Sequence, residues 1–369
     1  MTAFATATDW ELAEQLRLAV ADVFQTEDIT FGSGGPLLHH KAIRLRGRLL
    51  VNSHEAYTLI SERFRRLGFT ALLRKDSDGE MIVAAPGTAW ERAATRPWVP
   101  ALLLVLTLAS VIYIGASMDP APDGSIHIWN GLPFAVSLIA ILGAHELGHY
   151  FAARHVGTPV TLPYFIPMPV PPFGTMGAFI QMKGPSRDRR ALLTIAMAGP
   201  LAGLVVAIPV LILGLSLSHV EPLPTRGYIM EGNSLLYAAL KILLFGRFLP
   251  SDGLDVFLHP VAFAGWAGLL VTGLNLIPAG QLDGGHIVYT LLGTRSRTLT
   301  LVIILALLGL AWLWNGWLLW AFLVFLFSRT QATPLDDVTQ LTPIQRLLAI
   351  GMMLLFVLIF VPVPLTVHP

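Results

Sequence analysis

The sequence predicts a polytopic α-helical membrane protein with about six or seven transmembrane helices and a re-entrant β-like loop, preceded by a small α+β domain. Of the 369 residues, 54% are hydrophobic and only 13% are charged, whereas soluble proteins carry about 25% charged residues. Apolar runs of about 17–25 residues, long enough to cross a bilayer, recur after Trp98. The segment before Trp98 shows instead the shorter periodic patterns of a soluble domain.

Charge and cysteine content exclude several classes of function. The net charge is +1 and no run of Lys and Arg is present, so nothing indicates nucleic-acid binding. The absence of cysteine excludes disulfides, cysteine-ligated zinc, iron–sulfur clusters and thiol catalysis. The first apolar run begins near Trp98, too late for a cleavable secretory signal, and is expected to act as a signal anchor.

Residues 1–97 are expected to form a compact α+β domain of ferredoxin-like type. Their periodicity predicts, in order, a helix over 9–24, a strand over 42–51, a helix over 54–69 and a hairpin over 69–85 that turns at Asp78-Gly79. No catalytic constellation stands out in this region. We therefore expect a regulatory or docking module, available to a regulatory partner or to a second copy of the chain.

Residues 98–369 are expected to form the membrane domain. Apolar spans are predicted over 99–117, 131–153, 190–217, 260–279, 298–313, 315–328 and 344–363. The fifth and sixth spans could instead be one long tilted helix. Asn315-Gly316 between Trp314 and Trp317 favours a turn at the membrane interface, and this choice decides the side on which the C-terminus lies.

Positive charges orient the predicted spans. The connection over 118–130 has no Lys or Arg, whereas the connection over 154–190 carries Arg154, Lys183, Arg187, Arg189 and Arg190. Because cytoplasmic loops are enriched in Lys and Arg, the second connection and residues 1–97 are placed on the cytoplasmic side. The expected location is the cell membrane (the inner or plasma membrane) of a bacterium.

The strongest chemical signal is His145-Glu146-Leu147-Gly148-His149, which lies within an apolar span. Residues four apart share one face of a helix, so His145 and His149 can present two imidazole nitrogens to one tetrahedral ion. Glu146 can reach a water on that ion and take its proton. A chance occurrence of the motif is disfavoured, because polar groups inside an apolar span are costly and face a bundle interior or a cavity.

A catalytic zinc site usually has three protein ligands and one open position, so the two histidines require a third protein ligand. The stretch NLIPAGQLDGGHI supplies the candidates Asn275, Gln281, Asp283 and His286, in a helix interrupted by proline and glycine. Such non-helical backbone is tolerated at membrane depth only where it is buried or lines a cavity. From chemistry alone Asp283 leads, as an anionic oxygen ligand, and His286 is its rival. His155 is a poorer candidate, because it lies on another face of the first helix.

AHELGHYFAARHVG and NLIPAGQLDGGHI resemble, in this order, the two zinc motifs of the site-2 protease family of intramembrane zinc metalloproteases. The resemblance covers about residues 131–295 and is greatest to the bacterial, cyanobacterial and chloroplast branch, without an inserted PDZ domain. It implies one Zn²⁺ per chain, with His145, His149 and Asp283 as ligands and Glu146 as the catalytic base.

The resemblance also implies roles for residues around the two motifs. Asn275 falls on the family's membrane asparagine, which assists the oxyanion or shapes the site. The segment over 167–185 contains five prolines and cannot form a continuous helix; in the family it is a re-entrant loop at the active site. An exposed strand edge there could pair with an unwound substrate, through Gly174, Thr175, Met176, Gly177, Ala178 and Phe179. The small residues of MAGPLAG (197–203) suit close helix packing.

The predicted function is that of a zinc metalloendopeptidase acting in or near transmembrane segments, in regulated intramembrane proteolysis or membrane protein quality control. Its expected partners are transmembrane protein substrates within the lipid bilayer. A zinc-binding membrane transporter is an alternative, but it does not account for a glutamate held between two ligands. A proteolytically inactive, chaperone-like relative is another alternative, although such proteins lose motif residues and this chain keeps them.

Overall fold

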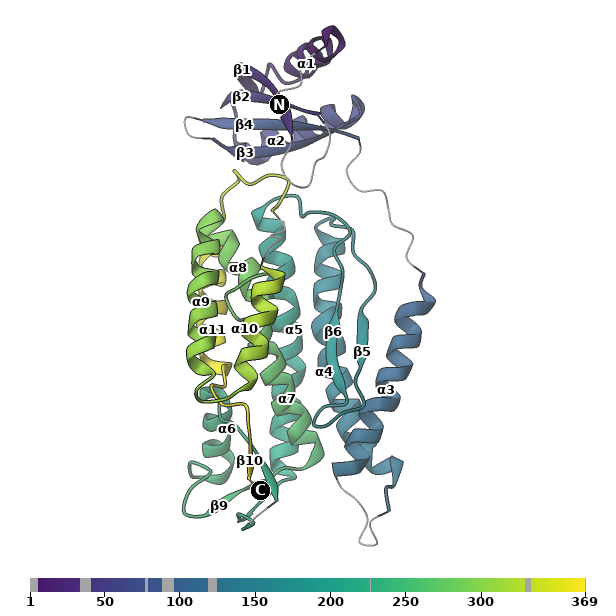
Figure 1. Ribbon diagram of the computed structural model, residues 1–369, viewed down its shortest axis with the longest axis vertical. Coiled ribbons are helices and arrows are strands. Elements are labelled where there is room, and N and C mark those ends of the chain that lie inside the picture. The colour runs from purple at the N-terminus through teal and green to yellow at the C-terminus, as the bar shows by residue number, and fades with distance from the viewer. Residues whose placement is uncertain are drawn as a thin grey trace.

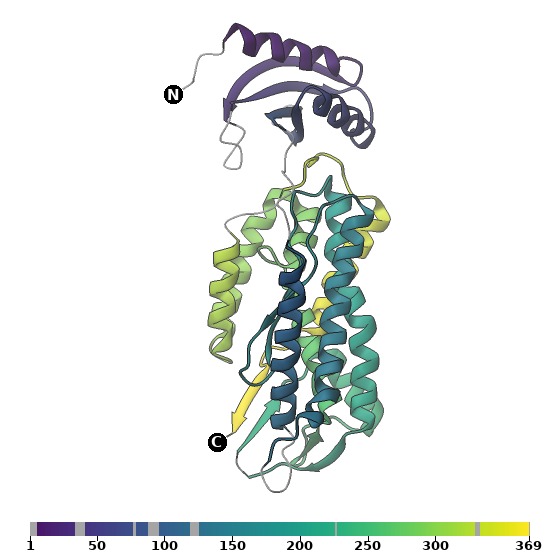
Figure 2. The same cartoon turned by 90° about the vertical axis from the view of Figure 1, so that its right-hand side faces the viewer.

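The computed structural model describes residues 6–33, 41–76, 79–87, 96–118, 125–225, 227–328 and 333–368 of the chain. A β-sheet with two helices forms one end of the molecule, and a long bundle of helices forms the rest (Figures 1 and 2). The C-terminus lies at the end of the bundle farthest from the N-terminal sheet (Figure 1).

The N-terminal region folds as α1 (Ala7–Ala19), β1 (Phe24–Ser33), β2 (Lys41–Leu49), α2 (Ser53–Arg66), β3 (Phe69–Lys75) and β4 (Glu80–Pro86). Its strands lie in the order β1-β2-β4-β3, and every neighbouring pair is antiparallel. Leu16, Leu45, Ile60 and Ile82 are fully buried in the core of this region. Because β3 stands last in this order, it is an edge strand of the sheet.

The structure corrects the sequence prediction of this region. The helix predicted over 9–24 ends at Ala19, and Phe24 begins β1, a strand absent from the prediction. A bulge interrupts the alternation of β1, which hides this strand from pattern reading. A ferredoxin-like order requires a parallel crossover, whereas these strands pair as antiparallel neighbours. Asp78 lies outside the described residues, and Gly79 lies at the predicted turn.

The bundle comprises α3 (Trp98–Met118), α4 (Leu132–His155), α5 (Arg189–Ser216), α6 (Leu235–Phe245), α7 (Pro260–Asn275), α8 (Asp283–Leu292), α9 (Ser296–Leu310), α10 (Gly316–Phe327) and α11 (Pro343–Ile359). Each predicted span falls on one of these helices. Within the described residues, four helical stretches are long and apolar enough to cross a membrane, over 98–118, 128–155, 189–216 and 283–310. Gly293, with φ +59°, interrupts the last of them.

The chain forms a helical hairpin at α9 and α10 rather than one long helix. α9 ends at Leu310, and α10 begins at Gly316 and lies beside α9 (Figure 1). In the turn, the N–H of Trp314 donates to the carbonyl oxygen of Leu310 at 3.1 Å. α10 has 12 residues, about 18 Å at the helical rise, against a hydrocarbon core of about 30 Å. The predicted turn is confirmed, but α10 is too short to be a full span.

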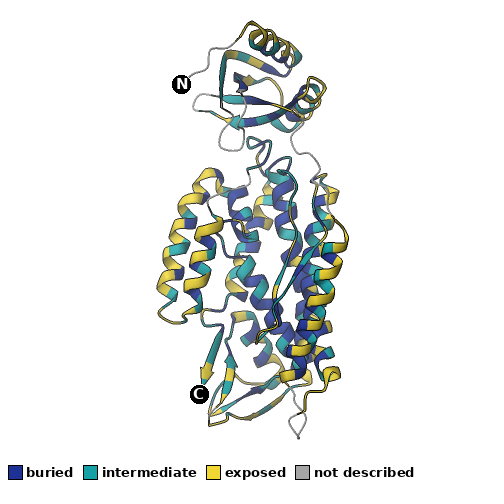
Figure 3. Cartoon of the chain, turned by 45° about the vertical axis from the view of Figure 1, so that its right-hand side comes forward, coloured by how far each residue is buried: buried dark blue, intermediate teal, exposed yellow. Residues whose placement is uncertain are grey.

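The outer faces of the helices are exposed, whereas their inner faces are buried (Figure 3). Large apolar side chains on the exposed faces include Val105, Val136, Val205, Leu305 and Phe322. Soluble monomers rarely expose apolar surface on this scale. The chain is therefore an integral membrane protein, as its composition predicts.

In the described part of the chain, three short strand pairs accompany the helices. Two lie at the end of the bundle opposite the N-terminal sheet: β7 (His219–Pro222) with β9 (Leu254–Phe257), and β8 (Tyr228–Glu231) with β10 (Leu365–His368). The third, β5 (Tyr164–Pro167) with β6 (Thr175–Phe179), lies between α3 and α4 (Figure 1). Ser110 of α3 donates to the carbonyl oxygen of Gly174 at 2.6 Å and holds this hairpin. The β-like loop predicted over 167–185 is thus a β-hairpin that begins slightly earlier.

Candidate metal centre

α4 directs the polar residues of the first motif toward the interior of the bundle. Pro133 lies in its first turn, where the missing N–H breaks no helical hydrogen bond. His145, Glu146 and His149 are 4%, 5% and 6% exposed, while Leu147 between them points outward and is exposed. The Nε2 atoms of His145 and His149 lie 3.2 Å apart. The two rings therefore converge, as their helical spacing predicts.

α5 packs directly behind the histidines through residues without side chains. A methyl group on Gly199 would lie 2.0 Å from His149 Nε2, and one on Gly203 would lie 3.1 Å from His145 Nδ1. His149 Nδ1–H donates to the carbonyl oxygen of Ile195 at 2.8 Å. This bond assigns the proton to Nδ1 and leaves the Nε2 lone pair available to a metal. Sequence reasoning identified the small residues of this helix but missed that they face the motif histidines.

Asp283 reaches the histidines because the helix is broken between α7 and α8. α7 ends at Asn275, and α8 begins at Asp283 itself. Gly280 between them has φ +62°, a conformation that favours glycine. The first turn of α8 folds back against the break so closely that a methyl group on Gly284 would lie 2.0 Å from the carbonyl oxygen of Leu276. The break therefore depends on glycine at both places.

His145, His149 and Asp283 meet from distant parts of the chain and fit a zinc ion. Asp283 Oδ2 lies 3.3 Å from His145 Nε2 and 3.2 Å from His149 Nε2. One donor atom of each residue lies within 4.8 Å of the other two, and this is the one such group in the part of the chain that the structure describes. Two imidazole nitrogens and a carboxylate oxygen suit catalytic zinc, with a fourth position for water or substrate.

The other predicted site residues lie around this group. Glu146, Asn275 and His286 line the same cavity, which has a volume of about 220 Å³. The side-chain amide nitrogen of Asn275 lies 3.4 Å from His145 Nε2. His286 lines the cavity but is not part of the group that could hold a metal. His155 is exposed at the end of α4 and lies outside the cavity.

The end of β6 borders the cavity. Ala178, Phe179 and the following Ile180 line it, and in the described part of the chain β6 pairs with β5 on one side only. Gly174 and Thr175 are buried at the start of the strand and do not line the cavity. Of the segment predicted to pair with substrate, only the second half therefore approaches the metal centre.

Zinc ligands inside an apolar helical bundle restrict the class of protein to membrane metalloproteins, and the neighbouring glutamate points within that class to the zinc metalloproteases. A comparison with protein families agrees, since residues 133–314 match the model of peptidase family M50. Both motifs fall within the match. The chain is a member of family M50, the site-2 protease family of zinc metalloproteases.

Similar proteins occur in plants. The chain is 30% identical over 335 residues to "Probable zinc metalloprotease EGY2, chloroplastic" of Arabidopsis thaliana. This match covers 87% of this chain and 59% of the relative. It is 28% identical over 387 residues to the protein of the same name in Oryza sativa subsp. japonica, covering 97% and 69%. It is 30% identical over 319 residues to "Probable zinc metalloprotease EGY1, chloroplastic" of Arabidopsis thaliana, covering 79% and 56%. The chain thus spans between 56% and 69% of the length of these relatives.

Replacing Gly199 by Ala is expected to displace the His149 imidazole, because the added methyl group would lie 2.0 Å from Nε2. We expect a loss of zinc affinity of about tenfold or more, the scale found when groups that orient metal ligands are altered. Gly143→Ala is the matched control, since nothing lies within 4 Å of its added methyl group. Zinc content at limiting free zinc measures both variants, and equal zinc in the two would contradict the expectation.

Asp283→Ala is expected to abolish zinc binding at limiting metal, because it removes the carboxylate oxygen that faces both histidines. His286→Ala is expected to retain zinc, since His286 lies outside the group of possible ligands. Elemental analysis of the purified variants decides between them. Zinc loss in His286→Ala alone would reverse the assignment of the third ligand.

Proposed function

We propose that this protein is an intramembrane zinc metalloendopeptidase that hydrolyses peptide bonds in or near transmembrane segments of other membrane proteins. The observation that carries the proposal is the cavity in which Glu146 lies beside His145, His149 and Asp283, within an apolar bundle. Ionisable groups are costly in such surroundings and are retained where they function. Membership of family M50 supports the same reaction.

In the proposed reaction, His145, His149 and Asp283 hold one zinc ion per chain. Bound zinc would supply Lewis acidity toward a water molecule and toward the scissile carbonyl group. The Glu146 carboxylate accepts a proton from the attacking water and passes it to the leaving amine. The carbonyl oxygen of Ile195 keeps the His149 proton on Nδ1 throughout. The chain's own contribution is therefore ligand orientation and one proton relay.

The substrate must unwind before cleavage, because the amides of an α-helix are engaged in its own backbone hydrogen bonds. We propose the edge of β6 that does not face β5 as the surface on which the unwound segment adds as a strand. Met176 to Phe179 supply its accessible part, whereas Gly174 and Thr175 are buried and anchor the hairpin. The amide of Asn275 is assigned to stabilising the oxyanion or shaping the site.

The orientation proposed for the bundle follows the positive charges. The connection between α4 and α5 and the adjoining helix ends carry Arg154, Lys183, Arg187, Arg189 and Arg190. This part of the chain faces the cytoplasm together with the N-terminal sheet. The hairpin of α9 and α10 then returns the chain to the cytoplasmic side, and the C-terminus ends outside after α11. Water would reach the metal centre from the cytoplasm, and the proposed location is a bacterial cell membrane.

Two alternatives make different use of the same residues. A zinc transporter needs ligands but has no use for Glu146, which lies 5% exposed beside the ligand group without belonging to it. A chaperone-like relative without proteolytic activity would not need the complete set of Glu146 and three ligands. The arrangement therefore favours hydrolysis over both.

Glu146→Gln is expected to lower the cleavage rate of a single-pass membrane substrate about 10²–10⁴-fold, the usual contribution of a general base. Zinc content should stay at the wild-type level, because Glu146 is not in the ligand group. Leu147→Ala is the control on the same helix turn, since this side chain points outward and is 41% exposed. Undiminished cleavage by Glu146→Gln would end the proposal.

Membrane proteomics of cells that carry the same two variants identifies the substrates. Cells carrying Glu146→Gln should accumulate uncut single-pass proteins that wild-type cells cleave. Cells carrying Leu147→Ala should not accumulate them. Identical membrane proteomes in wild-type cells and in cells carrying Glu146→Gln would contradict proteolysis and favour the transporter or the chaperone-like alternative.

A further inference from the structure

A short segment between α10 and α11 extends the N-terminal sheet into the bundle. Leu73 on the edge strand β3 donates its N–H to the carbonyl oxygen of Leu335 at 2.9 Å and accepts from the N–H of Asp337 at 3.0 Å. Asp336 between them forms a parallel bridge with Leu73. Residues 335–337 therefore act as an added strand on the β3 edge of the sheet, as in β-augmentation.

The other edge of this added strand pairs with the chain that leads into α5. The N–H of Leu335 donates to the carbonyl oxygen of Ser186 at 2.9 Å, and the N–H of Asp336 donates to that of Arg187 at 2.8 Å. Arg74 of β3 also donates to the carbonyl oxygen of Leu335 at 2.8 Å. Burial lowers the pKa of Arg74, but a guanidinium remains protonated at neutral pH. The N-terminal sheet is thus continuous with the entry to α5.

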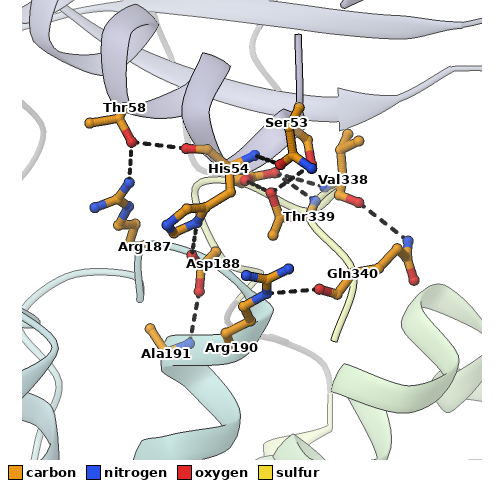
Figure 4. Close-up of polar contacts among 12 residues, drawn as sticks. Ser53, His54, Thr58, Arg187, Asp188, Arg190, Ala191, Val338, Thr339 and Gln340 are labelled. Carbon is orange, nitrogen blue, oxygen red and sulfur yellow. Dashed lines mark hydrogen bonds and ion pairs between the residues drawn. The ribbon is translucent and has the colours of Figure 1, made fainter. Parts of the chain in front are cut away.

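Side chains reinforce this junction from both sides (Figure 4). His54 Nδ1 lies 3.3 Å from Asp188 Oδ2, and Asp188 Oδ1 accepts from the N–H of Ala191 at 2.8 Å as the N-cap of α5. The hydroxyl oxygens of Ser53 and Thr339 lie 2.9 Å apart. The start of α2 therefore contacts both the first turn of α5 and the connection between α10 and α11.

The last residue of the added strand, Asp337, joins two helices of the bundle. Its Oδ1 accepts from Arg189 Nε, at the start of α5, and from the hydroxyl of Tyr289, on α8, both at 2.9 Å. The Arg189 guanidinium lies over the Tyr289 ring, 5.7 Å from its centroid. The Arg189 and Asp337 side chains are 13% and 12% exposed, so water screens this ion pair only weakly.

These two helices also contribute to the metal centre. On α5, Ile195 holds His149 and follows Arg189 by six residues, about 9 Å along the helix. On α8, Asp283 precedes Tyr289 by the same number of residues and the same distance. The Asp337 carboxylate therefore bridges α5 and α8 about one and two-thirds turns from the point at which they meet the histidines.

We infer that Asp337 is a positioning residue for the metal centre and that the N-terminal sheet holds it in place. By tying Arg189 to Tyr289, Asp337 sets the distance between α5 and α8, and so between His149 and Asp283. The docking of β3 on residues 335–337 orients the Asp337 side chain. The N-terminal region thereby controls how well the site holds zinc, an inference that rests on the proposed zinc site but not on proteolysis.

The test measures the rate at which the purified full-length, zinc-loaded protein loses zinc to an excess of EDTA. Asp337→Ala should raise this rate about 10–100-fold, the range found when groups that orient metal ligands are removed, and Tyr289→Phe should raise it less. The kcat of a cleavable substrate should fall with KM unchanged. Asp22→Ala is the control, because it removes an exposed ion pair with Arg63 inside the N-terminal region.

A second variant tests the contribution of the N-terminal region alone. Ser53→Ala with His54→Ala and Arg74→Ala removes the side-chain contacts of α2 with Thr339 and Asp188 and of β3 with Leu335. It changes no residue of the bundle, and it should also speed zinc loss. Zinc loss at the wild-type rate in Asp337→Ala, with or without a lower Tm, would overturn the positioning role. Should Asp337→Ala fail to fold, the rate of Tyr289→Phe decides in the same way. A wild-type rate in the Ser53/His54/Arg74 variant would overturn control by the N-terminal region.

Discussion

The close approach of α4 and α5 determines the geometry of the metal centre. A methyl group on Gly148 would lie 2.5 Å from the carbonyl oxygen of Ala198, and Gly199 leaves the space that the His149 ring occupies. Because glycine stands at these two contacts, the helices approach closely enough for the carbonyl oxygen of Ile195 to accept from His149. An unpaired imidazole N–H would be costly in an apolar interior, so this bond both satisfies the ring and fixes its orientation. Packing of small residues thus supports the polar chemistry.

The metal centre also requires a helix that ends and begins again at the level of the two histidines in the bundle. The break before Asp283 places a carboxylate at the beginning of α8, where the N-terminal end of a helix favours negative charge. α5 and α8 then supply the Ile195 carbonyl oxygen and the Asp283 carboxylate that face the histidines of α4, and the same two helices are joined at Asp337. The match to the rice relative covers 97% of this chain, so the similarity includes the N-terminal region as well as the bundle.

Much of the fold could be predicted because membrane helices are local features. Each predicted span lies on a helix, and the turn at Asn315-Gly316 was marked by its own residues and flanking tryptophans. β1 escaped prediction because its bulge disrupts the alternation on which strand prediction depends. The sequence did not predict that the helix begins again at Asp283, because proline and glycine indicate where a helix is interrupted but not where the next one begins. Strand order in the N-terminal sheet depends on pairing between distant segments and has no local signature.

For the site, the sequence by itself determined the ligand chemistry. The spacing of His145 and His149 fixes one face of one helix, and an anionic oxygen in a broken helix was the best third partner, a choice that the resemblance to site-2 proteases supported. Only the tertiary structure decided what surrounds these groups: Gly199 against His149, and Asp337 between two helices. The physical reason is distance along the chain. Neighbours within a helical turn leave a periodic pattern, whereas contacts between residues dozens of positions apart arise only when the helices pack.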